Sequence, residues 1–192
     1  WHYMGELMNI PRPSKHEEIV REFLVNWAKK NKIECRVDKV GNVIMKKPAT
    51  KGMENRKGVV LQAHIDMVPQ ARAGKVHDFQ KDPIVTRIVE DWVYATDTTL
   101  GADNGMGVAA AMAVLESKTL KHGPLEALFT TDEETGMTGA FGLKKGELKG
   151  KYLLNLDSET EGELYVGCAG GIDATMSIPY ATEKVSAKDY CS

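Results

Sequence analysis

Residues 59–66 have the sequence VVLQAHID, in which a short apolar run leads directly into an imidazole and a carboxylate. The run at 59–63 is typical of a central strand that is buried on both faces of a parallel or mixed sheet. In an extended chain the side chains of His64 and Asp66 point to the same side, because side chains alternate with a period of two. A carboxylate beside a metal-bound imidazole fixes the tautomer of the ring and raises its basicity. Taken alone, this pair is more often incidental than functional.

Apolar runs and helical patterns alternate along the rest of the chain. Ser14, with Glu17 three residues later, is a capping-box pattern, which predicts that a long helix begins at Ser14. Residues 104–116 are rich in Ala and Met and predict a second helix, and residues 138–144 predict a shorter one. Further strands are predicted at 34–38, 42–46, 125–130 and 152–156. Strands that alternate with helices imply an α/β fold, here a mixed β-sheet sandwiched by helices in three layers.

Composition and charge argue against several classes of protein. With 42% hydrophobic and 27% charged residues, the chain has the balance of a soluble globular protein with one substantial core. A net charge of -2 argues against nucleic acid as a partner, and no apolar run is long enough to cross a membrane. Cys35, Cys168 and Cys191 have wide, irregular spacings without a CxxC pair, which favours free thiols in the cytoplasm.

The segment at 99–107 reads TLGADNGMG and leads into the second predicted helix. Its glycines allow the backbone to lie close to a ligand, and Asp103 lies at or before the N-terminus of the helix. On this motif alone, a simple Asp N-cap after a glycine turn is the favoured interpretation. A phosphate loop is excluded because the GxxxxGK(S/T) pattern is missing.

Two acidic segments lie at the ends of predicted strands. Asp132, Glu133 and Glu134 come directly after the strand at 125–130, and Asp157 ends the last one. Runs of acids are usually solvated, but this one follows an apolar strand without a spacer. Carboxylates crowded at the rim of a sheet repel one another unless a cation neutralises them, and divalent metals commonly do so.

The combination carries more weight than any single motif. Four segments at predicted strand ends supply one histidine and several carboxylates, and ligands of α/β sheets collect outside the carboxyl ends of the strands. One imidazole with several carboxylates and no cysteine suits zinc, manganese or cobalt. A carboxylate beyond the ligands suggests a general base, and therefore a metal-dependent hydrolase. A coincidence of loop acids is the alternative.

Five ordered blocks resemble the dinuclear-zinc peptidase family that contains carnosinases, glutamate carboxypeptidase and aminoacylases. The blocks are LQAHIDMVP at 61–69, HDF at 77–79, TTLGADNG at 98–105, TDEETGM at 131–137 and NLDSE at 155–159. The likeness covers essentially the whole chain and is greatest to dipeptidases. It implies a catalytic domain with two zinc ions and a dipeptide as the substrate.

The resemblance also implies a role for each matching residue. His64 and Asp157 would bind one zinc ion, and Glu134 would bind the other. Asp103 would bridge the two ions. Glu133 would be the general base, which takes a proton from the attacking water and delivers it to the leaving amine. Asp66 would hold the His64 ring in place.

The chain departs from the family pattern in two respects. Family members complete the second metal site with a histidine far toward the C-terminus, and they insert a lid domain through which many dimerise. The other histidines of this chain lie outside the corresponding block; they are His2, His16, His77 and His122. We therefore expect residues 1–178 to be the N-terminal part of the catalytic domain and residues 179–192 to begin a linker or lid. Such a fragment would bind the second metal weakly and show little or no peptidase activity, and a homodimer is expected only of the longer protein.

Three functions stay open at this point. The first is a cytoplasmic zinc dipeptidase for unblocked short peptides such as Xaa-His, with cobalt or manganese as alternative metals. The second is a deacylase that uses the same residues on N-acylated amino acids. The third is a metal-binding module without activity. The blocks at 77–79 and 102–105 favour the first.

Overall fold

The computed structural model of the protein describes residues 1–168, 170–171 and 174–182. Contacts within the chain divide it into two units, Trp1–Glu159 and Thr160–Ser192. All helices and strands among the described residues lie in the first unit. The expected domain boundary after residue 178 stays a prediction, and most of the expected linker, from residue 183 on, lies outside the described residues.

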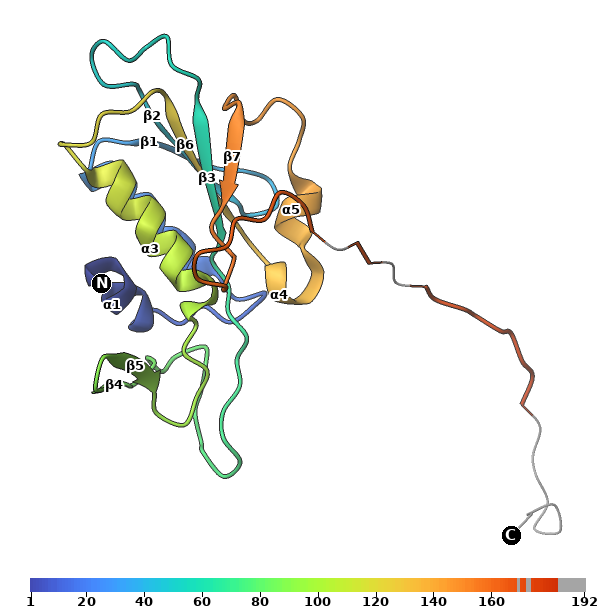
Figure 1. Cartoon of the computed structure of the whole chain (residues 1–192). Helices are drawn as coiled ribbons and strands as arrows, with labels where there is room; N and C mark the ends of the chain where they lie inside the picture. Colours follow the sequence, from blue (N-terminus) through green and yellow to red (C-terminus); the bar gives the residue numbers. More distant parts are fainter. Residues whose placement is uncertain (169, 172–173, 183–192) are drawn as a thin grey trace, which may run out of the picture. The chain divides into compact units, whose positions relative to one another are not determined.

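A five-stranded mixed sheet with the order β1-β2-β6-β3-β7 forms the centre of the first unit (Figure 1). Its strands are β1 (Glu34–Val37), β2 (Val43–Lys47), β3 (Val59–His64), β6 (Leu125–Thr130) and β7 (Tyr152–Asn155). β2 is antiparallel to both of its neighbours, whereas β3 is parallel to both β6 and β7. The register pairs His64 with Thr130 and Gln62 with Asn155. The carboxyl ends of the three parallel strands therefore lie at one edge of the sheet. All five predicted strands are present, but the run at 152–156, expected to be a central strand, forms the edge strand β7, whose residues are exposed.

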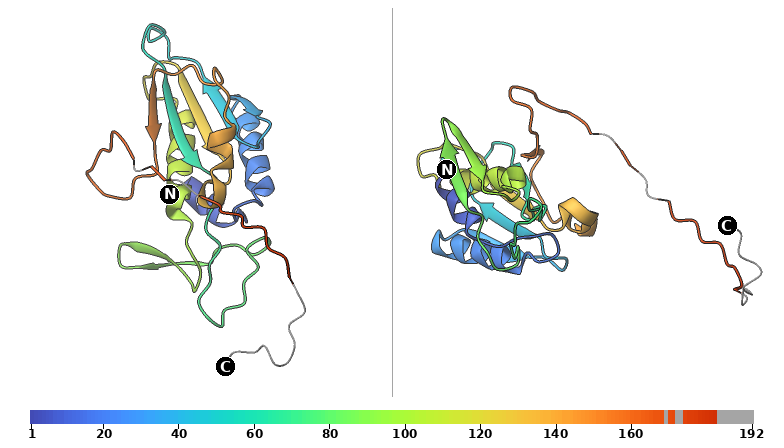
Figure 2. Two further views of the ribbon diagram at one scale, coloured as in Figure 1. Left: turned by 90° about the vertical axis from the view of Figure 1, so that its right-hand side faces the viewer. Right: turned by 90° about the horizontal axis from the view of Figure 1, so that it is seen from below.

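Helices cover both faces of this sheet (Figures 1 and 2). They are α1 (His2–Met8), α2 (Glu18–Lys30), α3 (Ala102–Glu116), α4 (Glu133–Gly136) and α5 (Thr138–Gly142). The first three pack on one face, and α5 lies on the other. This is the three-layer α/β arrangement that the alternation of patterns predicts. Among the helices that the structure describes, none combines the length and apolar character that crossing a bilayer requires.

The sheet contributes to two apolar cores because successive side chains of a strand point to opposite faces. In β6, Ala127 and Phe129 join the large core beneath α1, α2 and α3. Leu128, between them, joins a smaller core on the other face, together with Leu143 and Leu148. β6 is buried over its whole length, as expected for a central strand with apolar residues on both faces.

The predicted start of the first long helix at Ser14 is wrong, because α2 begins at Glu18. The Ser14 hydroxyl donates a hydrogen bond to the carboxylate of Asp66 at 2.8 Å instead of capping a helix. The Glu17 carboxylate accepts hydrogen bonds from the backbone N–H groups of Lys15 and Asp132. Both side chains of the capping-box pattern therefore hold the loop before α2, and Ser14 also ties that loop to the end of β3.

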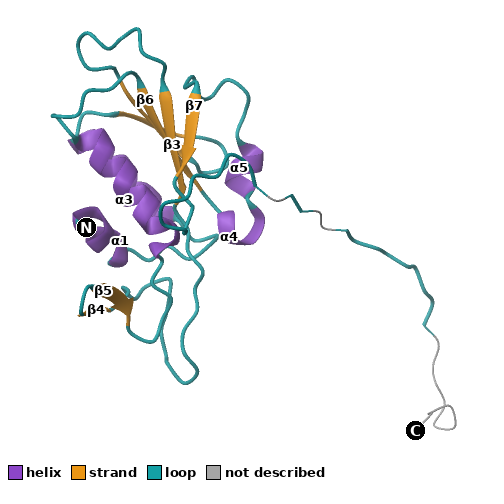
Figure 3. Ribbon diagram, viewed as in Figure 1, coloured by secondary structure: helices purple, strands orange, loops and turns teal. Residues whose placement is uncertain are grey.

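A separate antiparallel hairpin, β4 (Thr86–Val89) and β5 (Trp92–Ala95), lies apart from the main sheet (Figure 3). The sequence patterns did not predict it. Its apolar side chains Ile88 and Trp92 are 77% and 68% exposed. Without a buried face, the hairpin lacks the alternation of polar and apolar residues by which strands are recognised.

Candidate metal centre

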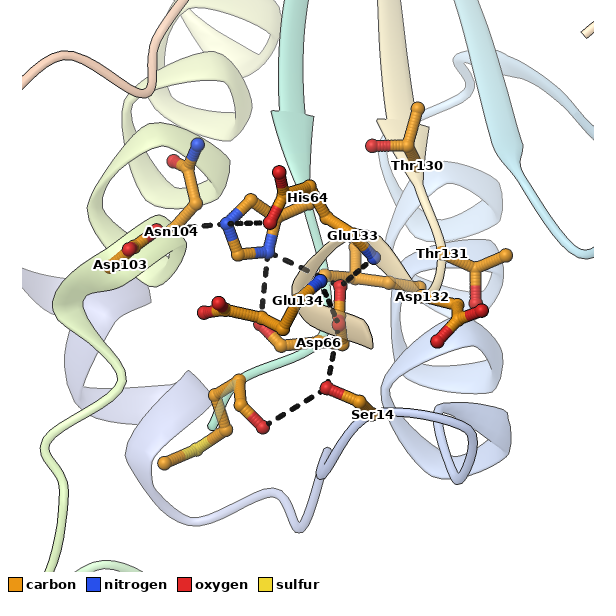
Figure 4. A network of polar contacts seen from close by, with 12 residues as sticks. Ser14, His64, Asp66, Asp103, Asn104, Thr130, Thr131, Asp132, Glu133 and Glu134 are labelled. Carbon is orange, nitrogen blue, oxygen red and sulfur yellow. Dashed lines mark hydrogen bonds and ion pairs between the residues drawn. The ribbon is translucent and has the colours of Figure 1, made fainter. Parts of the chain in front are cut away.

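Three strand ends and the start of one helix meet at one edge of the sheet; Figure 4 shows the ends of β3 and β6 and the start of α3. His64 is the last residue of β3, Glu133 and Glu134 begin α4 just beyond β6, and Asp157 lies two residues beyond β7. Asp103 lies in the first turn of α3. Since β3, β6 and β7 are parallel, their ends bring these side chains together. The structure thus gathers all six predicted site residues: His64, Asp66, Asp103, Glu133, Glu134 and Asp157.

The Nε2 atom of His64 faces three carboxylates. It lies 2.8 Å from Asp103 Oδ1, 3.5 Å from Asp157 Oδ1 and 3.9 Å from Glu133 Oε2. Donor atoms of His64, Asp103 and Asp157 lie within 4.8 Å of one another, and so do those of His64, Glu133 and Glu134. The ring is 1% exposed, whereas the Asp103 side chain is 48% exposed. Two groups of possible metal donors therefore share one buried imidazole, and their carboxylates remain open to a ligand.

The Nδ1 atom of His64 faces Asp66, at 3.2 Å from its Oδ1 and 3.2 Å from its backbone carbonyl oxygen. The Asp66 carboxylate also accepts hydrogen bonds from the backbone N–H groups of Glu133 and Glu134, at 3.0 Å and 3.2 Å, and from the Ser14 hydroxyl. Burial raises the pKa of Asp66, but the hydrogen bonds, that of His64 first, outweigh burial and hold this pKa at about 2. Asp66 is therefore an ionised carboxylate that links the ends of β3 and β6.

Charge is unevenly distributed over the cluster. Burial lowers the pKa of His64, but hydrogen bonds to Asp157 and Asp66 outweigh it and raise this pKa to about 11. Burial, followed by the neighbouring Asp157, raises the pKa of Asp103, whereas the hydrogen bond with His64 lowers the pKa of Asp157. Burial also raises the pKa values of Glu133 and Glu134. The carboxylates thus favour a positive charge at this edge of the sheet.

These residues fit a divalent metal. One imidazole and several carboxylates form the kind of donor set that zinc and related metals bind. The carboxylates outnumber the cations beside them, so a bound metal ion would relieve their mutual repulsion.

The glycine-rich segment before α3 has a different local structure from a simple helix cap. The residue preceding α3 is Gly101, with a φ of 70°, and no side chain caps this end. The Asp103 backbone is not helical, and its carboxylate approaches His64. The interpretation of Asp103 as an N-cap is therefore wrong. Asn104, which the sequence did not single out, donates a hydrogen bond to Asp157 Oδ1 at 2.6 Å.

The three consecutive acids have different surroundings. Asp132 accepts hydrogen bonds from the hydroxyls of Thr135 and Thr138, and its backbone has a φ of 51°. Figure 4 shows its side chain directed away from His64. Glu133 and Glu134 face the cluster. In the local sequence, Thr135 and Thr138 are the signal that the Asp132 carboxylate accepts structural hydrogen bonds instead of facing the cluster.

Comparison with known proteins agrees with this arrangement. Residues 60–178 match the family model described as peptidase family M20/M25/M40. The chain belongs to this family. The resemblance expected from the five sequence blocks is thereby confirmed.

Two relatives illustrate the extent of the match to the family. The chain is 54% identical over 187 residues to the cytosol non-specific dipeptidase of Escherichia coli strain K12. This match covers 97% of the chain and 39% of that protein. The crystal structure of aminoacylhistidine dipeptidase from Vibrio alginolyticus has a TM-score of 0.85 and 59% identity, and the match covers 88% of this chain and 34% of that one. The structure of the aminopeptidase PepT from Bacillus cereus has a TM-score of 0.70 and 26% identity, over 83% of this chain and 43% of that one. The matches thus cover about 34–43% of the length of these proteins.

Proposed function

We propose that the protein acts as a metal-dependent dipeptidase on unblocked short peptides, including Xaa-His dipeptides. The observation that carries the proposal is the pair of donor groups that share His64 at the carboxyl ends of the parallel strands. The names of the Escherichia coli and Vibrio alginolyticus relatives, both dipeptidases, support the substrate class. The name of the former also supports a place in the cytosol.

The metal ions of the proposed centre are two divalent cations, with zinc as the first choice and cobalt or manganese as alternatives. In this proposal His64 and Asp157 would be ligands of one ion, Glu134 would be a ligand of the other, and Asp103 would be a ligand of both. The position of Asp103 supports the assignment, since its Oδ1 is the carboxylate oxygen nearest to His64 Nε2. Bound metal ions would polarise the scissile carbonyl and lower the pKa of water.

Glu133 is the proposed general base. Its Oε2 lies 3.9 Å from His64 Nε2, farther than the oxygens of Asp103 and Asp157, and its side chain is 32% exposed. Its raised pKa, which results first from burial, suits a group that accepts a proton from water and returns it to the leaving amine. Asp66 holds the imidazole from the Nδ1 side and leaves Nε2 as the ring nitrogen that would bind a metal.

The 192-residue chain alone is expected to have little or no activity. His77 packs its ring against Phe79, with centroids 4.4 Å apart, and His122 Nδ1 lies 2.8 Å from the carbonyl oxygen of Gly123. Neither belongs to the two donor groups, which leaves His64 as the imidazole of the site among the described residues. Weak binding of a second ion follows. Dimerisation through a lid domain is proposed for the longer protein only.

A substrate panel tests the function. A protein that contains this chain would be assayed with Xaa-His and other dipeptides and with N-acetylated amino acids. Hydrolysis of the dipeptides, and its loss by about 10²–10⁴-fold in Glu133→Gln, is expected for a general base. Glu22→Gln, on the exposed face of α2, is the matched control and should keep full activity. Preference for the N-acetylated substrates would establish a deacylase instead, and full activity in Glu133→Gln would refute the role of Glu133.

A further inference from the structure

A buried arginine lies beside the carboxylate cluster. Arg12 is only 1% exposed and belongs to the loop between α1 and α2. This loop runs alongside the chain beyond β3, because Met67 N–H donates to the Arg12 carbonyl at 3.1 Å and Ser14 N–H donates to the Met67 carbonyl at 3.3 Å. Pro13 and Met67 also form a parallel bridge. The backbone around Arg12 is thus anchored next to the segment that carries His64 and Asp66.

The guanidinium of Arg12 joins two segments that are distant in sequence. Its Nη1 donates to the carbonyl oxygens of Ile65 and Asp66, at 3.1 Å and 3.0 Å. Its Nη2 donates to the carbonyl oxygen of Gly101, two residues before Asp103. The Asp66 carbonyl oxygen that receives Nη1 is the same oxygen that lies 3.2 Å from His64 Nδ1. One side chain therefore contacts both the carbonyl beside the imidazole and the loop that presents Asp103.

The two glycines of the LGADNG segment are explained by this guanidinium. A Cβ atom at Gly101 would lie 2.6 Å from Arg12 Nη2, and one at Gly105 would lie 2.7 Å from it. Gly105 N–H also donates to the Gly101 carbonyl at 3.1 Å. The bare Cα atoms thus let Arg12 lie flat against the loop, so these glycines accommodate a side chain of the protein itself.

We propose that Arg12 is a positioning residue that holds the Asp103 loop at a defined distance from His64 and so sets the spacing of the metal ligands. This inference rests on the proposed function. A planar guanidinium donates to several carbonyls in fixed directions, whereas a lysine ammonium is a compact charge on a flexible stem. Asp66, Asp103 and Glu134 lie near enough to compensate its buried charge. Groups that orient metal ligands without touching the metal typically affect its affinity by about 10–100-fold.

Arg12→Lys is the decisive variant, because it keeps the charge and removes the fork. Arg21→Lys is the matched control. Arg21 Nε donates to the Gly41 carbonyl at 2.9 Å, and a Cβ atom at Gly41 would lie 2.8 Å from its guanidinium, but this contact fixes a turn before β2. Both variants of the 192-residue chain would be compared with the parent by circular dichroism, amide hydrogen exchange without metal, and titration with Co²⁺ followed by visible absorption.

We expect Arg12→Lys to keep the fold, to speed hydrogen exchange of the Gly105 amide at least tenfold, and to weaken Co²⁺ binding by about 10–100-fold with an altered absorption spectrum. Arg21→Lys should leave the Gly105 exchange and the Co²⁺ spectrum unchanged. Unchanged exchange and affinity in Arg12→Lys, or equal changes in both variants, would overturn the proposal.

Two other results of these experiments would also test the proposal. If Arg12→Lys does not fold, Gly105→Ala displaces the guanidinium without deleting it, and it should weaken Co²⁺ binding in the same way; wild-type affinity in Gly105→Ala would refute the inference. If the parent chain binds no Co²⁺, the proposed metal centre fails, while the exchange of the Gly105 amide still decides whether Arg12 holds the loop.

Discussion

The substitution Asp66→Asn tests the carboxylate on which the edge of the sheet depends. Asp66 is 0% exposed and accepts from the N–H groups of Glu133 and Glu134, from the Ser14 hydroxyl and from the His64 ring. Asparagine has nearly the same shape but only one acceptor oxygen, since its other terminal atom is a donor. At least one of the four donors must therefore lose its partner.

The magnitude follows from the best orientation of the new amide. With its oxygen toward the Glu133 N–H and the His64 ring, the amide nitrogen faces Ser14, whose hydroxyl can rotate to accept, and the Glu134 N–H, which cannot. A lost hydrogen bond to a charged group costs about 1.5–3 kcal/mol. The retained bonds also weaken, because charge-assisted bonds are roughly twice as strong as neutral ones. Relief of repulsion among the nearby carboxylates offsets part of this loss, and we expect a net decrease of about 2–4 kcal/mol in the free energy of unfolding.

Urea unfolding of the metal-free chain at neutral pH, followed by circular dichroism, measures this change. With a slope of about 2 kcal/mol per molar urea, the midpoint should fall by roughly 1–2 M. Asp78→Asn is the control, because Asp78 is an exposed carboxylate that accepts from Gln80 N–H and pairs with Lys81. The control should change stability by no more than about 0.5 kcal/mol. If Asp66→Asn has an effect as small as the control, the carboxylate does not hold these N–H groups and our account of this edge is wrong.

Three further results are expected. Elemental analysis should find divalent metal in the purified chain and less or none in Asp103→Ala; equal metal content would remove Asp103 from the proposed ligands. Gly139→Ala should lower the free energy of unfolding by about 1–3 kcal/mol in urea titrations, because the new Cβ would lie 2.6 Å from the Thr131 carbonyl oxygen, and wild-type stability would contradict this packing. Peptide mapping after brief alkylation at neutral pH should show slower reaction at Cys35, whose pKa burial raises, than at the exposed Cys168; the reverse order would show that Cys35 is accessible as a thiolate.

Local patterns were sufficient for the main sheet. The apolar runs at 59–63 and 125–130 predict central strands, because a strand buried on both faces needs apolar residues at successive positions. The run at 152–156 also forms a strand, but the expectation that it is central is wrong, because β7 lies at the edge of the sheet and its residues are exposed. Each predicted acid lies within a few residues of the end of a strand or the start of a helix. Once strands are parallel, their carboxyl ends meet at one edge, so the cluster could be anticipated without knowledge of the packing.

The sequence patterns were less informative where an element has no buried face or where a side chain has two competing uses. The hairpin β4–β5 was missed because its side chains are largely exposed. Ser14 fits a capping box, yet its hydroxyl donates a hydrogen bond to the carboxylate of Asp66, 52 positions further along the chain. Asp132 stands in line with Glu133 and Glu134, but its carboxylate accepts from nearby threonine hydroxyls.

The sequence by itself determined the α/β class, the central strands and the set of acids around His64, because these follow from periodicity and from positions close together in the chain. Only the tertiary structure decided how the set is held together. Arg12 reaches the Ile65 carbonyl across 53 positions and the Gly101 carbonyl across 89, and no local pattern specifies such hydrogen bonds. They form only once the sheet, the loop before α2 and the start of α3 are packed, since buried donors must then find whatever acceptors the fold places beside them.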